Sequence, residues 1–97
     1  MRYIIVDAAL HGTGIRDYYG GGYIEPERLN LDSGLIKRVN DWLIRYENEH
    51  YNGFSNKKLV EDLDCEGISI ARIIKDVLSD VKIDYFSTAK MIKEEIV

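Results

Sequence analysis

The fold is decided by the stretch NKKLVEDLDCEGISIARIIKDVLS, residues 56–79. When its residues are placed about 100° apart, as in an α-helix, the apolar residues and one glycine fall on a single side. That side consists of Leu59, Val60, Leu63, Gly67, Ile70, Ala71, Ile74, Val77 and Leu78. The pattern predicts a long amphipathic helix that begins near Ser55 or Asn56, ends near Ser79 and buries this side.

Gly67 lies in the middle of the apolar side of this helix. A glycine inside a helix costs about 1 kcal/mol relative to alanine, so a buried one needs a compensating gain. We expect another backbone to approach closely at Gly67. The alternative is a helix that breaks into two pieces there.

A second amphipathic helix is predicted upstream. Asp32 or Ser33 can cap its N-terminus, and we expect it to end near Glu49. Its apolar stripe follows the spacing i, i+4, i+7, i+8 and i+11, and consists of Leu35, Val39, Trp42, Leu43 and Tyr46.

Two segments read as strands. Residues 2–8, RYIIVDA, are rich in β-branched and aromatic side chains and predict a largely buried strand. Residues 81–87, VKIDYFS, alternate apolar and polar side chains, which predicts a strand with one buried face. In the tail, Met91, Ile92, Glu95 and Ile96 stand at helical spacing and predict one or two amphipathic turns.

These elements predict one α+β domain that spans residues 1–97. Its small sheet of two to three strands is covered by two long amphipathic helices. A chain of this length buries about two thirds of the surface that its unfolded form exposes, which argues against a large enclosed active site.

The irregular part of the chain contains DYYGGGYIEPE, residues 17–27. Three glycine amides could hold a phosphate, but such loops normally open a helix, and here the chain continues in extended form from Tyr23. We expect a hairpin-type or bulged turn instead. Tyr18, Tyr19 and Tyr23 surround it, and tyrosines are typical anchors of protein interfaces. They are predicted to contact a partner protein; the alternative is packing onto the helices.

Acidic residues crowd the first half of the helix over residues 56–79. Glu61, Asp62, Asp64 and Glu66 are placed on its outer side, where they complement the positive helix N-terminus. Ile68 falls outside the apolar stripe, within this negative surface. An apolar side chain among acids is the composition expected where a basic protein docks, so these five residues form a second predicted contact surface.

Catalytic motifs are weak in this sequence. HGTG, residues 11–14, follows a strand but has no GxSxG, Walker lysine or GxGxxG beside it, and a short glycine motif in that place is usually a turn. His11 and His50 lack the spacing of metal ligands. We expect no enzymatic activity, cofactor or metal. The alternative is a small ligand-binding or catalytic protein that uses the His11–Gly14 loop, with Asp7 or Asp17 orienting His11.

Charge and composition bound the partners and the compartment. Seventeen acidic and thirteen basic side chains give a net charge of −4, the wrong sign for binding nucleic acid directly. No segment reaches the roughly 18 apolar residues that a membrane span needs. The N-terminal apolar run is interrupted at Asp7, unlike a signal peptide, and the single Cys65 cannot form an internal disulfide. We expect a cytoplasmic protein.

The order of these landmarks resembles that of small bacterial immunity proteins of contact-dependent growth inhibition and related polymorphic toxin systems. The resemblance covers about residues 12–86. It comprises GTGIRD, GGGYIEPERLNLDSG with Leu29 and Leu31 in an extended approach to the first helix, Trp42 and Tyr46 on that helix, Glu66 and Gly67 on the second, and Tyr85 and Phe86 at the end of a strand.

The resemblance implies a non-enzymatic inhibitor that binds a cognate toxin domain in the cytoplasm. Many such toxins are nucleases, whose basic surfaces an acidic protein can cover. Because immunity proteins diversify at the contact surface, the resemblance assigns no contact residue. A third possibility, from another class, is a subunit or adaptor of an unrelated complex.

Overall fold

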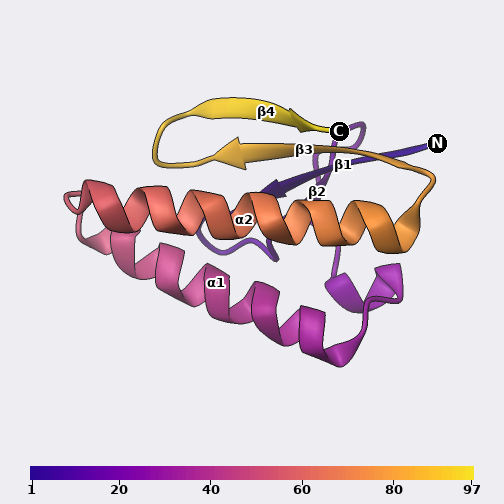
Figure 1. Ribbon diagram of the computed structural model, residues 1–97, viewed down its shortest axis with the longest axis horizontal. Coiled ribbons are helices and arrows are strands. Elements are labelled where there is room, and N and C mark those ends of the chain that lie inside the picture. The colour runs from indigo at the N-terminus through magenta and orange to yellow at the C-terminus, as the bar shows by residue number, and fades with distance from the viewer.

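The computed structural model describes all residues, 1–97. Along the chain, β1 and β2 come before the 3-10 helix η1 and the two long helices, and β3 and β4 follow them (Figure 1). The elements are β1 (Arg2–Asp7), β2 (Ile15–Asp17), η1 (Pro26–Leu29), α1 (Ser33–Tyr51), α2 (Lys57–Leu78), β3 (Val81–Ser87) and β4 (Ile92–Ile96).

The four strands form one mixed sheet in the order β2-β1-β3-β4. β1 and β3 are parallel, whereas the β1–β2 and β3–β4 pairs are antiparallel. Parallel neighbours need a crossover connection, and α1 and α2 supply it on one side of the sheet (Figure 1). The α+β class and the two helices are confirmed, but the expected number of two to three strands was too low.

Both helices begin at the caps that the sequence offers. The Asp32 carboxylate accepts a hydrogen bond from the Leu35 amide at 2.7 Å, and the Asn56 side chain accepts one from the Leu59 amide at 3.0 Å. These bonds satisfy amides that have no partner inside a helix. The predicted starts and the end of α2 are confirmed, and α1 extends slightly beyond Glu49 to Tyr51.

Helix α2 is continuous through Gly67, so the predicted alternative of a broken helix is wrong. Gly67 faces inward as expected, but side chains rather than a backbone fill the space at its α-carbon. A Cβ there would meet the Tyr85 ring and stand 2.7 Å from Cζ2 of Trp42. The close approach also lets Nε1 of Trp42 donate to the Leu63 carbonyl at 2.8 Å.

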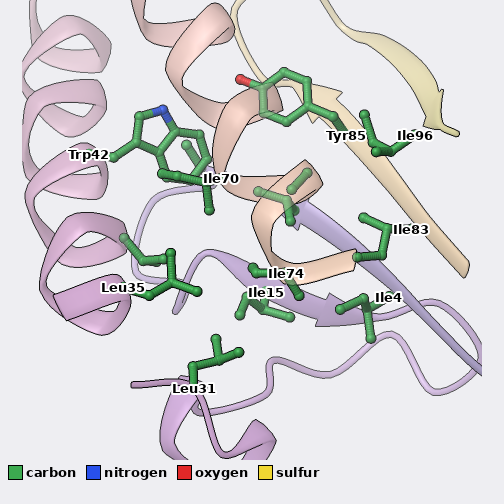
Figure 2. Close-up of a cluster of buried hydrophobic side chains, with 14 of the residues drawn as sticks. Ile4, Ile15, Leu31, Leu35, Trp42, Ile70, Ile74, Ile83, Tyr85 and Ile96 are labelled. Carbon is green, nitrogen blue, oxygen red and sulfur yellow. The ribbon is translucent and has the colours of Figure 1, made fainter. Parts of the chain in front are cut away.

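The core lies between the helices and the sheet (Figure 2). Trp42 projects from α1, Ile70 and Ile74 from α2, and Ile83 and Tyr85 from β3 into one cluster of buried side chains. Each of these five side chains is no more than 2% exposed. The apolar faces predicted for the two helices therefore pack against the sheet, as expected.

The tail forms a strand, so the prediction of amphipathic helical turns there was wrong. β4 pairs with β3 in a register that sets Ser87 opposite Ile92 and Ile83 opposite Ile96. Met91 adopts a left-handed conformation (φ 58°) and donates its amide to the Ser87 carbonyl, which reverses the chain into a hairpin. The spacing of apolar residues in this segment is compatible with a helix, but pairing with β3 stabilises the strand instead.

The approach to α1 is not extended. Leu29 ends the 3-10 helix η1, and Asn30 takes a left-handed conformation (φ 58°) before the cap residue Asp32. Leu29 and Leu31 are both buried. Neither α1 nor α2 has the apolar length required to cross a bilayer.

Candidate functional site

One face of the sheet carries no helix, and we call it the open face (Figure 1). Side chains alternate across a strand, so residues between the core-facing ones point to the open face. β1 contributes Tyr3, Ile5 and Asp7, β2 contributes Arg16, β3 contributes Lys82, Asp84 and Phe86, and β4 contributes Lys93 and Glu95.

Three tyrosines gather on the open face, and we call them the tyrosine cluster: Tyr3, Tyr18 and Tyr19. The Tyr18 ring stacks on Tyr3 with 4.0 Å between centroids, and Tyr19 meets both rings edge-on at 6.0 and 5.5 Å. The Tyr18 amide donates to the Tyr3 carbonyl at 2.9 Å, which holds the cluster against β1. Tyr18 is 46% exposed and Tyr19 72%, so the cluster presents aromatic surface to solvent.

A carboxylate lies beneath the cluster. Asp84 is 2% exposed, accepts a hydrogen bond from the Tyr3 hydroxyl, and lies 3.5 Å from Nζ of Lys93. The hydrogen bond to Asp84 is the main reason that the pKa of Tyr3 rises from 10.0 to about 12. Lys82 and Lys93 also stand 4.8 and 5.5 Å from the Tyr3 and Tyr18 ring centroids, within cation–π range. The Tyr3 and Tyr18 rings are therefore held in place by contacts within the chain.

The glycine-rich turn is closed by its own aspartate. The Asp17 carboxylate accepts the amides of Tyr19 and Gly20 at 3.3 and 3.2 Å, and the Asp17 amide donates to the Gly22 carbonyl at 2.8 Å. Gly21 takes a positive φ of 74°, which glycine adopts without strain. The expected hairpin-type turn is confirmed, and the Tyr19 and Gly20 amides that a phosphate would need already bind Asp17.

Tyr23 lies apart from the tyrosine cluster. Its backbone forms a bridge with Arg16, and its ring covers Gly12, where a Cβ would stand 2.7 Å from Cζ of Tyr23. It is 43% exposed. It borders a surface hollow of about 620 Å³ that is also lined by Arg2, Asp17, Ile24, Glu25 and Arg28. The structure thus brings the rings of Tyr18 and Tyr19 together, whereas the Tyr23 ring lies against Gly12 and outside the tyrosine cluster.

Asp64 is buried, so its predicted place on the outer side of α2 was wrong. It is 5% exposed and accepts hydrogen bonds from the hydroxyls of Tyr46 (2.8 Å), Tyr85 (2.6 Å) and Ser87 (2.8 Å). Asp64 follows Val60 by four residues and precedes Gly67 by three, spacings that place it beside the buried stripe. Burial is the first cause of the raised pKa of both Tyr46 and Tyr85.

The other three acidic residues of the predicted surface are paired within the chain. Glu61 binds Lys90, and Asp62 binds Lys58 at 3.2 Å. Glu66 forms a two-pronged ion pair with Arg38 of α1, with N–O distances of 2.7 and 2.8 Å. The hydrogen bond from Arg38 lowers the pKa of Glu66. These acids therefore do not form an unbalanced negative patch.

Ile68 is less exposed than the sequence pattern indicated. It is half-buried, packs against the core, and lines a small hollow of about 140 Å³ between α2 and β4. Like Asp64, it lies on the flank of the buried stripe, three residues before Ala71. Of the predicted acidic surface, Glu61 and Asp62 remain exposed.

The His11–Gly14 loop does not join a histidine to a carboxylate. His11 is exposed, and the Asp7 carboxylate instead binds Arg16 at 2.8 Å and accepts the Ala9 amide at 2.9 Å. Asp17 is used by the glycine turn. No three histidine, cysteine or acidic side chains in the chain are grouped as metal ligands.

The sequence contains signals for some of the open-face residues that were not predicted. Tyr3 alternates with the buried Ile4, which places it on the opposite face of β1. Its meeting with Asp84 depends on the parallel pairing of β1 with β3, which the sequence pattern does not specify. Comparison of the chain with protein-family models, curated proteins and solved structures gave no match.

Proposed function

We propose that this chain is an immunity protein that binds a cognate bacterial toxin domain and occludes its functional surface. The tyrosine cluster is the observation that carries the proposal. It is an exposed, laterally fixed aromatic surface on a sheet face that no helix covers. Rigid tyrosines lose little conformational entropy on binding, and they are enriched among the residues that dominate interface energies.

The contact is centred on Tyr18 and Tyr19. Tyr19 is the more exposed and supplies the larger new contact area, while Tyr18 is held between Tyr3 and Lys93. The hydroxyl of each exposed ring can exchange a water for a group on the partner. Of the other predicted contact residues, Tyr23 lies outside the tyrosine cluster, Glu61 and Asp62 lie on α2, and Asp64, Glu66 and Ile68 serve contacts within the chain.

The expected partner is a basic toxin domain, in keeping with a nuclease. The net charge of −4 attracts a basic protein at long range, although Glu61, Asp62 and Glu66 are each paired within the chain. Steering of this kind speeds association, and salt weakens it, whereas the aromatic contact governs dissociation. The two effects are separable in binding kinetics.

The experiment is co-expression of the chain with a candidate toxin domain, taken from the C-terminal end of a large secreted protein if one is encoded beside it, followed by measurement of growth and affinity. Protection is expected, and Tyr19→Ala is expected to weaken the complex by about thirtyfold, the loss typical of an interface hot spot. Tyr51→Ala is the matched control, because Tyr51 is 70% exposed but lies at the end of α1. Equal affinities for Tyr19→Ala and Tyr51→Ala would contradict the proposed surface.

The alternative of a ligand-binding or catalytic loop at His11–Gly14 has less support, because Asp7 and Asp17 are engaged elsewhere. The variant His11→Ala is expected to protect cells as well as the original chain does. Loss of protection by a folded His11→Ala protein would return that loop to consideration.

A further inference from the structure

Strand β4 has a neighbour on one side only. The sheet order β2-β1-β3-β4 places it at an edge, and β4 lies at the outer margin of the molecule in Figure 1, beyond α2 and α1. Four of its five residues are exposed. An edge strand leaves backbone N–H and C=O groups without partners, and these can pair with a strand from another chain.

The residues of β4 are complementary to a second copy of themselves. The strand reads IKEEI, residues 92–96, and an antiparallel pair with a two-fold axis at Glu94 sets Ile92 opposite Ile96 and Lys93 opposite Glu95. A two-fold axis makes every such contact occur twice. We propose that two copies of this chain associate through antiparallel β4–β4 pairing in this register, a property independent of toxin binding.

The charged side chains of β4 are placed to form ion pairs across the proposed dimer. Lys93 and Glu95 lie on the open face, with side chains 49% and 58% exposed. Their intrachain ion pairs, Lys93 with Asp84 at 3.5 Å and Glu95 with Lys82 at 3.8 Å, are long. In the dimer, each Lys93 meets the Glu95 of the second copy, which extends these pairs into a row of alternating charge.

The opposite side of β4 supplies the apolar contact. Ile92 is 60% exposed, and Ile96 opposite it would cover part of that surface. Ile92 and Glu94 also line the hollow between α2 and β4. Glu94 is the one residue that meets its own copy with like charge, and no ion pair within the chain engages it.

A second copy is a better occupant than an unrelated strand. Charged residues on an edge strand usually prevent association, because an arbitrary partner does not match them. The lysine and glutamate of β4 stand at equal distances on either side of Glu94, so the chain itself is a matching partner. The dimer would place both tyrosine clusters on the same face of one continuous sheet.

The test is sedimentation equilibrium of the full chain over a range of concentrations and at low and high salt. A dimer is expected, and Lys93→Glu should weaken it at least tenfold because two acids then face each other across the axis. The double variant Lys93→Glu with Glu95→Lys restores opposite charges and should restore the dimer. Exchange of the exposed pair Lys58 and Asp62 on α2 is the matched control and should leave association unchanged.

Circular dichroism establishes that each variant is folded, since Lys93 and Glu95 also contact β3. Glu94→Gln removes the like-charge contact at the axis and should tighten the dimer. Loss of folding would not produce tighter association, so this variant distinguishes the two effects. A monomer at every soluble concentration would overturn the proposal. So would a folded double variant that associates no better than Lys93→Glu alone.

Discussion

Two buried aspartates lie on opposite sides of the sheet and are held in different ways. On the helix side, Asp64 accepts hydrogen bonds from buried hydroxyl groups of α1 and β3. On the open face, Asp84 is bound by Tyr3 and Lys93, whose side chains reach solvent. Both carboxylates are at most 5% exposed, but the three hydroxyl donors of Asp64 are themselves buried, whereas Tyr3 and Lys93 are not.

The difference separates the stability of the core from the arrangement of exposed side chains. The hydroxyl groups around Asp64 tie the two helices to β3, so a change there disturbs the whole fold. The groups around Asp84 hold surface rings in one arrangement, so a change there disturbs chiefly the tyrosine cluster. A buried polar group can therefore stabilise the core or hold exposed rings in place, depending on what covers it.

The largest expected effect is that of Asp64→Ala. Removal of this carboxylate leaves three buried hydroxyl groups without their acceptor, and Lys90 keeps only Glu61 of its two acidic neighbours. We expect a loss of about 3–5 kcal/mol in the free energy of unfolding, measured by urea denaturation. Asp84→Ala should cost about 1 kcal/mol, because its partners can turn to water. Equal losses at the two sites would break the comparison.

Gly67→Ala tests how closely the helix side is packed. An added methyl group must displace the buried Trp42 or Tyr85 ring, and the gain in helix propensity does not offset that displacement. We expect a loss of about 1–3 kcal/mol in chemical denaturation. Gly22→Ala is the control, since nothing lies within 4 Å of a Cβ at that turn position. A Gly67→Ala protein as stable as the control would show a looser core than the structure describes.

The ion pair of Glu66 with Arg38 is half-exposed. We therefore expect it to contribute less to the free energy of unfolding than Asp64 or Gly67. Glu66→Gln should cost about 0.5 kcal/mol at neutral pH, after allowance for solvent screening. The pKa of Glu66 is lowered in the fold, so its stabilising effect is present above the unfolded value of about 4.5 and lost as pH falls. Denaturation at two pH values checks this, and a difference that grows in acid would contradict it.

The smallest effect expected is spectroscopic. Tyr3, Tyr46 and Tyr85 have raised pKa values, so they keep their protons above the ordinary value of 10.0. Their contribution to stability is present below pH 10 and is lost as pH rises toward their folded-state values. Tyr3→Phe should remove a component near pH 12 from the ultraviolet titration of the folded protein. An unchanged titration would mean that Tyr3 and Asp84 are not bonded in solution.

Local pattern was sufficient for the helices and the main strands. The caps Asp32 and Asn56 and the apolar stripes of α1 and α2 depend on contacts within a few residues, which the sequence contains in full. The same holds for the inward position of Gly67 and for the turn at Asp17. The predicted exposure of Tyr18 and Tyr19 also agrees with the structure, although their role in binding stays a prediction.

Tertiary structure decided the rest. The segment Ile92–Ile96 suits a helix or a strand by its own spacing, and only the edge of β3 makes the strand favourable. Asp64 became an interior residue because hydroxyl groups far along the chain satisfy its charge, and Tyr3 meets Asp84 because β1 and β3 are parallel neighbours. The amino-acid sequence by itself determined the elements whose partners are near in the chain; long-range pairing determined the sheet edge and the open face, because those contacts exist only once the chain has folded.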